Sequence, residues 1–330
     1  MKTTISIIIP NLDGADLLPE CLGSLASQGV TSELIVVDNA SSDASVDIVQ
    51  EICPDALIIS NDHNAGFAGA VSQGAHASSG DLLLFLNTDV VMPPLVLAEL
   101  LAIMNGNPDV GACQPTLLTP EGQLDSAGSL FTKTGFLHHL TETDLLGEPE
   151  VGERFALKGA CLLVRREAYV EAGGFDPSYF AYFEETDLCW RMRLTGWKLL
   201  HVGTVSVTHG VGKTTTRFFS SHYIDYLSFR NRITTIRKNT NPHLRLRVLI
   251  PHVVLCVGIA MAFLVRKRPR NTAAIFKALA WHVRNGAEVK ASRVVVSGLR
   301  TEGDHSIDSV SIAMSFRYAK SLLRTYLVRW

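Results

Sequence analysis

The sequence predicts an α/β fold built on a doubly wound, mostly parallel sheet, followed by a helical basic C-terminal segment. Runs of β-branched and leucine residues alternate with amphipathic stretches about every 25 residues, a pattern typical of strand–helix–strand units. Hydrophobic residues make up 47% of the 330 residues, which is enough for a large core. Acidic and basic residues are divided unevenly along the chain, which indicates two functional parts.

The N-terminal part is predicted to contain buried parallel strands that end in polar residues. These strands are Ile5–Ile9, Glu33–Val37, Ala56–Ile59 and Leu82–Leu86. The stretches between them have helical patterns, at Leu17–Ala26, Val46–Ile52 and Phe67–Ala77. The first strand runs directly into Pro10, so it is too short for the core of a secretory signal.

The pattern loosens between residues 110 and 155, where Gly, Thr and Pro are frequent, and we expect loops and edge strands over a pocket there. A strand at Lys158–Arg165 and a short helix at Arg166–Ala172 follow. Glu185–Thr195 is predicted as a helix, and Trp197–His209 as a pair of strands. Six well-separated cysteines without a CxxC pair disfavour a disulfide framework or a cysteine zinc site.

The charge division places a boundary near residue 216. Residues 1–216 carry 10 Lys and Arg against 27 Asp and Glu, whereas residues 217–330 carry 20 against 5. An acidic domain binds nucleic acid poorly, and the basic part has no recognisable nucleic-acid motif, so we expect no nucleic-acid partner. The basic part, predicted to be mainly helical, suits an anionic membrane surface.

Within the basic part, Val248–Val265 has no formally charged residue, and arginines and a lysine flank it on both sides. Eighteen residues is the lower limit for crossing a bilayer, and Pro251 near the start weakens that interpretation. Three interpretations stay open: an interfacial or re-entrant membrane helix, a single span, and a core helix of a soluble subdomain.

Polar residues follow the predicted strands at Pro10-Asn11, Asp38-Asn39 and Asn87-Thr88-Asp89. Ligands of doubly wound sheets bind at the carboxyl ends of the strands, so these residues predict one pocket. Asp38 suits a nucleobase or ribose, although residues 38–43 also read as a helix N-cap. The first strand-to-helix turn has no GxGxxG, which disfavours a dinucleotide fold.

Two further segments carry residues suited to anions and cations. Asn64-Ala65-Gly66-Phe67-Ala68-Gly69 precedes a helix, where glycines allow close backbone approach and the helix N-terminus favours an anionic group; an ordinary turn is the alternative. Asp89 offers an oxygen ligand for Mg²⁺ or Mn²⁺, and His209 at a later strand end is a candidate second ligand or a structural histidine.

A carboxylate cluster, formed by Glu184, Glu185 and Asp187, lies among aromatic residues. An apolar setting and like charges raise carboxyl pKa values, as a general base requires. The alternative is an acidic helix N-terminus stabilised by the helix dipole.

Together these motifs resemble the family 2 glycosyltransferases of the GT-A fold, and among them bacterial rhamnosyltransferase-like members that build cell-surface polysaccharide. The resemblance covers roughly residues 5–216 in the family's order. Its pieces are Ile7-Ile8-Ile9-Pro10-Asn11, Val36–Asp43, Asn64–Gly69, Leu86-Asn87-Thr88-Asp89, Lys158-Gly159-Ala160, Gly173-Gly174-Phe175-Asp176, Tyr182–Arg191 and His209.

The resemblance implies an inverting, metal-dependent hexosyltransferase. Residues 1–216 would be the nucleotide-sugar-binding and catalytic domain, and residues 217–330 a membrane-associated region at the cytoplasmic face of the cell membrane, peripheral, monotopic or with a single span. Asp38 would hold the base and ribose of a dTDP- or UDP-sugar, and Asp89 and His209 would bind Mg²⁺ or Mn²⁺. The implied nucleotide-sugar-binding residues are Pro10, Asn11, Asp38, Asn39, Asn64, Gly66, Phe67, Asn87, Thr88, Asp89 and Gly159.

The implied base is the second member of an acidic pair, here Glu185, with Glu184 and Asp187 as alternatives because the family usually has Asp there. Leu12 stands where an aromatic residue is common, which affects nucleobase stacking. The acceptor would be a growing glycan or a lipid-linked glycan, with rhamnose as one candidate donor sugar. The alternative function is a non-catalytic nucleotide-sugar-binding scaffold subunit of a glycan-assembly complex.

Overall fold

The computed structural model describes residues 3–211, 217–301 and 311–312 of the chain. Its centre is a mixed sheet with the strand order β10-β12-β6-β11-β4-β1-β2-β3. In addition, β5 pairs with β12 and β7 pairs with β6. The strands are β1 (Ile5–Asn11), β2 (Glu33–Asp38), β3 (Leu57–Ser60), β4 (Leu82–Leu86), β5 (Val90–Val91), β6 (Val110–Leu118), β7 (Leu124–Ser126), β10 (Val151–Glu153), β11 (Cys161–Arg165) and β12 (Lys198–His209).

The first half of the sheet confirms the predicted parallel arrangement. β1 pairs in parallel with both β2 and β4, and β2 pairs in parallel with β3. The register places Asn11 opposite Asp38, and Asp38 opposite Ser60. The polar residues that end these strands therefore lie at one edge of the sheet, as predicted.

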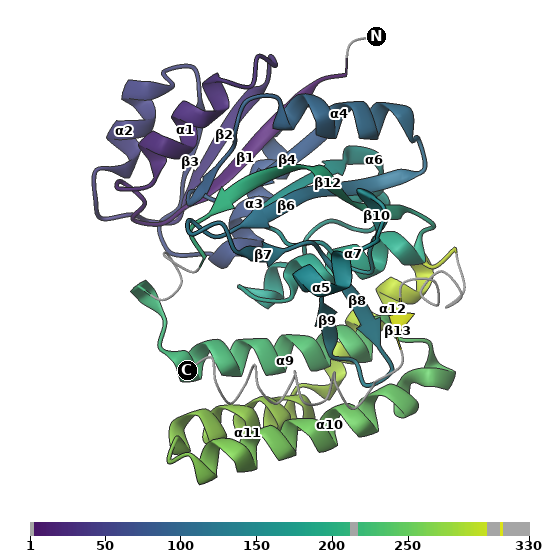
Figure 1. Cartoon of the computed structure of the whole chain (residues 1–330). Helices are drawn as coiled ribbons and strands as arrows, with labels where there is room; N and C mark the ends of the chain where they lie inside the picture. The colour runs from purple at the N-terminus through teal and green to yellow at the C-terminus, as the bar shows by residue number, and fades with distance from the viewer. Residues whose placement is uncertain (1–2, 212–216, 302–310, 313–330) are drawn as a thin grey trace.

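Helices cover both faces of the sheet, so that the domain has three layers (Figure 1). One core contains residues of α1 (Leu18–Ala26), α2 (Ser45–Ile52) and α4 (Val96–Gly106). The other contains residues of α3 (Gly66–Ala77), α6 (Arg166–Glu171) and α7 (Glu184–Leu194). Successive residues of β1 point to opposite faces of the sheet, so Ile8 packs in one core and Ile7 and Ile9 pack in the other.

Two of the predictions for the second half of the sheet are wrong. β6 is not an edge strand: it lies between β12 and β11, and its residues Val110–Pro115 are buried. Its Gly and Pro residues hid the strand pattern. Trp197–His209 is one long strand rather than a pair, because a shift of register between Val202 and Ser206 lets β12 stay paired with β6 past Gly203.

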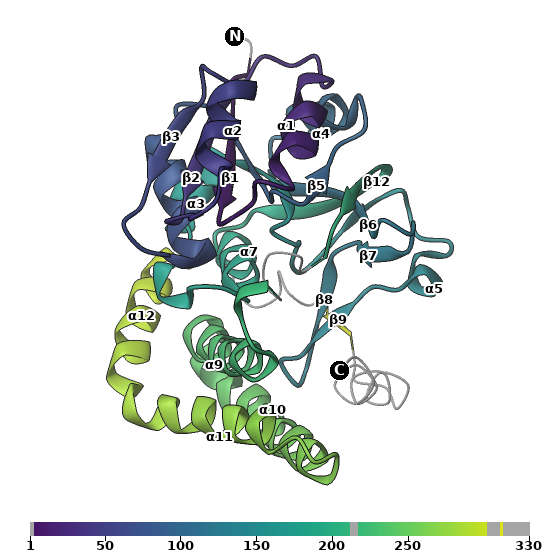
Figure 2. The same ribbon diagram turned by 90° about the vertical axis from the view of Figure 1, so that its left-hand side faces the viewer.

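The remaining short elements of residues 110–155 agree better with the prediction. β8 (Ser129–Thr132) and β9 (Leu137–His139) form a hairpin outside the main sheet, and α5 (Glu142–Leu145) follows it. The hairpin descends from the sheet toward the C-terminal helices (Figures 1 and 2). At its turn, Phe136 stacks on His252 with ring centroids 4.4 Å apart.

The C-terminal helices form a layer beneath the sheet, with α12 rising along one side (Figure 2). They are α9 (Ser221–Asn239), α10 (Pro242–Val265), α11 (Pro269–Arg284) and α12 (Gly286–Leu299). The prediction of a mainly helical segment is confirmed for residues 217–301. The short strand β13 (Ser311–Ile312) pairs with β8, and the rest of residues 302–330 lies outside the described residues. The boundary at residue 216 stays a prediction.

α10 contains the apolar stretch whose environment the sequence left open. Within the described part of the chain it is the one helix long and apolar enough to cross a membrane. One face is buried against α9 and α11, through residues such as Cys256, Ile259 and Phe263. The opposite face exposes Leu246, Ile250, Val254, Val257, Met261 and Leu264. α10 is therefore packed on one side and apolar toward solvent on the other.

Candidate active site

A cavity of about 130 Å³ lies at the carboxyl edge of the parallel strands. It brings together most of the residues predicted to bind a nucleotide-sugar: Pro10, Asn11, Asn39, Asn64, Gly66, Phe67, Asn87, Thr88 and Asp89. Leu12, Phe180, Ala181 and Phe219 complete the lining. Phe180 and Phe219 lie edge to face with ring centroids 5.9 Å apart, so aromatic surface is present even though Leu12 is aliphatic.

Asp38 stands behind this lining rather than in it. Its carboxylate is buried and accepts hydrogen bonds from Asn11 Nδ2 (2.8 Å), Ser41 N (3.0 Å) and Ser41 Oγ (2.5 Å). Asn11 is held by this carboxylate and lines the cavity, and its buried Oδ1 atom accepts no hydrogen bond from the described residues. In this arrangement Asp38 acts on the cavity through Asn11.

The Asn64–Gly69 segment folds into the start of α3, as predicted. Asn39 fixes it by donating to the Gly66 carbonyl (3.2 Å). Gly66 has φ +75° and its missing Cβ would collide with the Phe180 carbonyl, so only glycine fits. That same carbonyl accepts from Ala68 N at 3.1 Å, so one amide of the first turn is already used within the protein.

The predicted metal ligands lie together because β12 pairs with the segment after β4. His209 is opposite Val90 in an antiparallel pair, and Gly210 N donates to the Asp89 carbonyl at 2.8 Å. His209 Nε2 and Asp89 Oδ1 are 3.5 Å apart, and both side chains are nearly buried. This separation is longer than a hydrogen bond and leaves two electron-rich atoms facing each other.

Asp125 is a site residue that the sequence reasoning missed. Its carboxylate lies 2.8 Å from His209 Nδ1 and accepts from Lys158 Nζ at 2.7 Å. Burial alone would raise the pKa of Asp125, but the hydrogen bond from His209 and the Lys158 ammonium lower it. The Asp125 carboxylate favours a proton on Nδ1, and in the neutral imidazole with that proton the Nε2 lone pair is directed at Asp89.

This pair fits a divalent cation. A carboxylate oxygen and an imidazole lone pair that face each other without a shared proton are stabilised by a positive ion. Asn87, in the same wall, has an Oδ1 atom without a hydrogen-bond partner among the described residues. No group of three or more His, Cys, Asp or Glu side chains suited to a metal occurs in the described residues, so Asp89 and His209 are the ligands of these types that the site offers.

A second cavity, of about 740 Å³, opens on the other side of His209. Its lining includes Asp125, Lys158 and Glu185, together with hydroxyl side chains such as those of Ser129 and Thr141. The contacts from Asp89 through His209 to Asp125 therefore link the two cavities. Gly159 sits between them, because a Cβ on Gly159 would lie 3.4 Å from Glu185 Cβ and 3.5 Å from Phe67 Cζ.

The three predicted carboxylates point in different directions from the first turn of α7. Glu185 lines the second cavity, and Glu184 is buried beside it. One carboxylate oxygen of each accepts no hydrogen bond from any described residue. Burial raises the pKa of Glu184 and of Glu185, and the Glu185 carboxylate raises that of Glu184 further.

Asp187 faces away from both cavities, toward α9. It pairs with Arg191 and Lys238, each at 2.8 Å. Burial would raise its pKa, but Arg191 and then Lys238 lower it to about 2. The structure therefore brings Glu184 and Glu185 to the site and separates Asp187 from it.

Residues 6–169 match the family model described as Glycosyl transferase family 2. Among curated proteins, the O-antigen biosynthesis protein RfbC of Myxococcus xanthus is 30% identical over 218 residues, which is 62% of this chain but 17% of that protein. An N-acetylglucosaminyl-diphospho-decaprenol L-rhamnosyltransferase of Mycobacterium tuberculosis is 29% identical over 224 residues, 60% of this chain and 73% of that protein.

Solved structures share the fold at low sequence identity. A mannosyltransferase from Pyrobaculum calidifontis, in complex with GDP-Man and Mn²⁺, has a TM-score of 0.57 and 17% identity, covering 99% of this chain and 86% of its own. S. aureus TarS 1-349 with UDP-GlcNAc has a TM-score of 0.57 and 15% identity, covering 93% and 90%. These likenesses confirm the GT-A fold that the sequence predicts.

Proposed function

We propose that this chain, which is a glycosyltransferase of family 2, transfers a hexose with inversion from a nucleoside-diphosphate sugar to a hydroxyl of a glycan acceptor. The observation that carries the proposal is the link between the two cavities. Asp89 borders the smaller cavity, Asp125 and Glu185 border the larger one, and His209 lies between Asp89 and Asp125. A donor and an acceptor in these cavities would meet at this wall.

In this proposal the smaller cavity binds the donor. Asn11, Asn39 and Asn64 would hydrogen-bond the nucleoside, and Phe180 and Phe219 would contact the base. Asp89 and His209 would hold Mg²⁺ or Mn²⁺ against the diphosphate, with Asp125 fixing the imidazole. A bound divalent cation supplies charge stabilisation to the departing diphosphate without proton transfer.

Glu185 would act as the general base. As the acceptor oxygen bonds to the anomeric carbon, the bond from that carbon to the diphosphate oxygen breaks, and Glu185 takes the hydroxyl proton. A raised pKa suits this task, because the carboxylate then has higher proton affinity near neutral pH. Glu184 is the alternative base, whereas the ion pairs of Asp187 argue for a structural role.

The donor nucleotide would be a dTDP- or UDP-sugar, and rhamnose is the first sugar to test. Support comes from the relatives named for L-rhamnosyl transfer and O-antigen biosynthesis, and from a fold neighbour solved with UDP-GlcNAc. The acceptor would be a growing glycan or a lipid-linked glycan. The Mycobacterium relative is named for transfer to a decaprenol-linked diphospho sugar, which supports a lipid-linked acceptor.

The test is binding and slow hydrolysis of a panel of nucleotide-sugars with and without Mg²⁺ or Mn²⁺. We expect one donor to be hydrolysed only with the cation, and the activity to be lost in Asp89→Ala. Metal-dependent binding without turnover, even with glycan acceptors present, would favour the scaffold subunit instead. Absence of binding to every donor would contradict the proposal.

The proposed membrane contact is peripheral and lies at the cytoplasmic face of the cell membrane. Leu246, Ile250 and Val254 on α10 are 59–65% exposed. Arg245, Arg247, Arg266 and Lys267 flank this apolar face along the chain. A packed inner face and an apolar outer face favour a helix lying in the interface over one crossing the bilayer.

Flotation with vesicles that contain anionic lipid tests this contact. Ile250→Asp with Val254→Asp should weaken binding at least about tenfold, because two apolar side chains lose their transfer energy. Leu146→Asp is the matched control, since Leu146 is 80% exposed but lies in the loop after α5. Equal flotation of all variants would contradict the α10 contact.

A further inference from the structure

The segment that carries the acidic pair is bound by α9, a helix of the basic part. Residues 231, 235, 238 and 239 recur at the spacing of one helical face, and all four are buried. This face of α9 contacts residues 176–187, which lead from the loop before η1 (Pro177–Tyr179) into α7. α9 therefore touches the segment that ends in Glu184 and Glu185.

The middle of this segment has an unfavourable backbone. Phe180, Tyr182 and Phe183 have φ values of 65°, 70° and 72°. Bulky residues avoid this left-handed region, so such a conformation persists only when the surroundings fix it. Fixing it costs folding energy, and strained backbone of this kind clusters at functional sites.

Two neighbouring residues of α9 bind this segment. Arg230 Nη2 donates to the carbonyl oxygens of Ser178 (3.1 Å) and Tyr179 (3.0 Å), and Asn231 reaches further into the turn. Its amide nitrogen Nδ2 lies 3.0 Å from the carbonyl oxygen of Tyr179, 2.8 Å from that of Ala181 and 2.7 Å from that of Tyr182. Its Oδ1 atom accepts from Arg230 Nε at 2.8 Å. The Asn231 amide nitrogen therefore lies within hydrogen-bonding distance of three carbonyl groups of the strained turn.

The turn of residues 179–183 lines the smaller cavity and leads into a residue of the larger one. Phe180 and Ala181 line the smaller cavity, and the Phe180 carbonyl binds Ala68 N at the start of α3. The chain then enters α7, where Glu185 lines the larger cavity. A shift of this turn would therefore move the donor wall and the acidic pair together.

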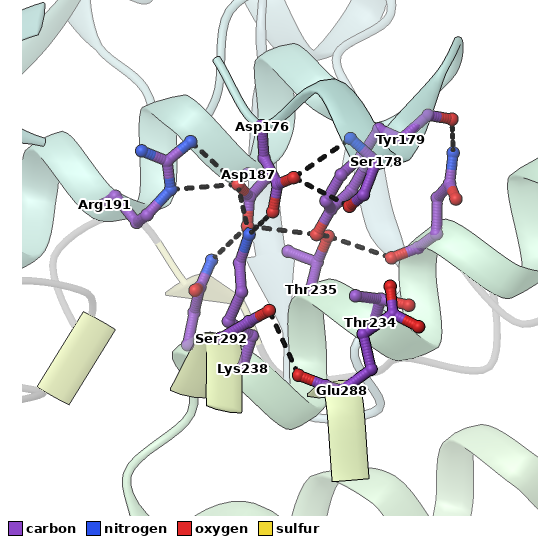
Figure 3. A network of polar contacts seen from close by, with 12 residues as sticks. Asp176, Ser178, Tyr179, Asp187, Arg191, Thr234, Thr235, Lys238, Glu288 and Ser292 are labelled. Atoms are coloured by element: carbon purple, nitrogen blue, oxygen red, sulfur yellow. Dashed lines mark hydrogen bonds and ion pairs between the residues drawn. The ribbon is translucent and has the colours of Figure 1, made fainter. Parts of the chain in front are cut away.

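A charged network anchors the ends of the same segment (Figure 3). Lys238 Nζ donates to Asp176 and to Asp187, both at 2.8 Å. Tyr179 Oη donates to Asp187 at 3.1 Å and lies 2.7 Å from Thr235 Oγ1. With both ends anchored, Asn231 sets the conformation between them.

We infer that Asn231 is a positioning residue that couples the donor wall to the acidic pair through the 179–183 turn. The inference rests on the proposed function, because that turn lines the cavity proposed for the donor and leads into the helix that carries the proposed base. Asn231 itself lines neither cavity and reaches the smaller one only through the backbone of Ala181, so its effect on transfer would be indirect. Through these contacts α9 helps to position the active-site residues, although it lies beyond the predicted boundary at residue 216.

The test compares Asn231→Asp with Asn271→Ala. Asp keeps the shape of Asn but donates no hydrogen bond, so it removes the bonds to the carbonyls without opening a cavity. Asn271 is a buried asparagine of α11 whose Nδ2 donates to Asp225 of α9 at 2.7 Å, away from the turn. It controls for the loss of a buried amide hydrogen bond.

We expect Asn231→Asp to lower kcat about 10-fold to 100-fold, because misplaced reacting groups lose rate steeply. We also expect faster amide hydrogen exchange in residues 179–187. Asn271→Ala should keep kcat within about twofold and leave exchange in that segment unchanged. If Asn231→Asp does not fold, Asn231→Ser, which keeps one donor, should show a smaller effect of the same kind.

Unchanged kcat and unchanged exchange in the folded Asn231 variants would overturn the inference, as would an equal loss of kcat in Asn271→Ala. If the wild-type chain turns over no donor, the proposed function fails. The exchange measurement then still decides whether Asn231 holds the turn.

Discussion

The first turn of α7 holds two kinds of buried carboxylate a few residues apart. Asp187 is fully buried, yet Arg191, Lys238, Asn239 and Tyr179 all bind it. Glu184 is almost as buried, and its Oε2 atom, like that of Glu185, has no hydrogen-bond donor among the described residues. Their pKa values accordingly move apart, with Asp187 at about 2 and the two glutamates raised.

The difference matches the proposed roles, structural for Asp187 and chemical for the two glutamates. Partners compensate the desolvation of Asp187, so its charge ties α7 to α9. Nothing comparable compensates Glu184 and Glu185, so their burial costs stability, a cost that active sites commonly carry. Each variant below acts on one side of this comparison.

The largest effect is expected from Glu185→Gln. Without a base, transfer should fall about 10²-fold to 10⁴-fold, the usual contribution of general base catalysis. Because the variant also removes a half-buried carboxylate with a raised pKa, its Tm should equal or exceed that of the wild type. Transfer rates and a thermal melt measure both, and normal transfer in the folded variant would make Glu184 the candidate base.

The next effect is expected from Asp187→Asn. The substitution leaves Arg191 and Lys238 with less negative charge in a buried setting, so the free energy of unfolding should fall by about 3–5 kcal/mol. Urea unfolding measures the change. Asp109→Asn removes an exposed ion pair with Lys198 and should change stability little, because solvent screens such pairs. If the two variants have the same free energy of unfolding, Asp187 does not have the structural role described here.

A smaller effect is expected from Asp125→Ala. The imidazole of His209 loses the partner of its Nδ1 atom, so affinity for Mn²⁺ should fall about 10-fold to 100-fold. Electron paramagnetic resonance titration of free Mn²⁺ reports this directly. Asp55→Ala, in an exposed position after α2, is the control and should bind Mn²⁺ as the wild type does. An unchanged Mn²⁺ affinity in Asp125→Ala would show that Asp125 does not support the proposed metal site.

The smallest effect is a difference in the pH dependence of stability. A raised pKa in the folded state means that folding favours protonated Glu184, so stability is greatest below the ordinary value of 4.5 and declines as pH rises through the raised pKa. Asp187 acts oppositely, contributing stability above 3.8 that is lost as pH falls toward 2. Melts between pH 4.5 and 8 should show a flatter profile for Glu184→Gln than for the wild type. Parallel profiles would contradict the assignment.

Much of the donor side could be predicted from the sequence, because it depends on local pattern. Ile5–Asn11 and Glu33–Asp38 read as buried parallel strands, and parallel strands bring their carboxyl ends to one edge, so Asn11 and Asp38 had to be neighbours. Asp89 follows from the same rule. The sequence placed Asp38 in the pocket, but in the structure Asn11 lines the cavity and Asp38 binds Asn11 from behind. This difference depends on side-chain packing, which strand patterns do not encode.

The other side of the site depends on contacts between distant segments. Asp125 meets His209 only because β12 continues past an irregular register to the end of β6, a strand that the glycine and proline pattern concealed. Asn231 meets the 179–183 turn through the packing of a helix whose composition indicates only a basic segment. Phe219, from the chain after β12, likewise lines the smaller cavity through a contact between distant segments.

The most direct test of the central claim is the rate of donor turnover per folded molecule in Glu185→Gln and Asp187→Asn, measured side by side below the Tm of both. The donor is the nucleotide-sugar that the wild type uses, with water as acceptor if no glycan serves. We predict that Asp187→Asn keeps at least about tenfold more activity than Glu185→Gln, because only the glutamate takes part in the reaction. A fully active Glu185→Gln beside an inactive, folded Asp187→Asn would contradict the division of roles on α7.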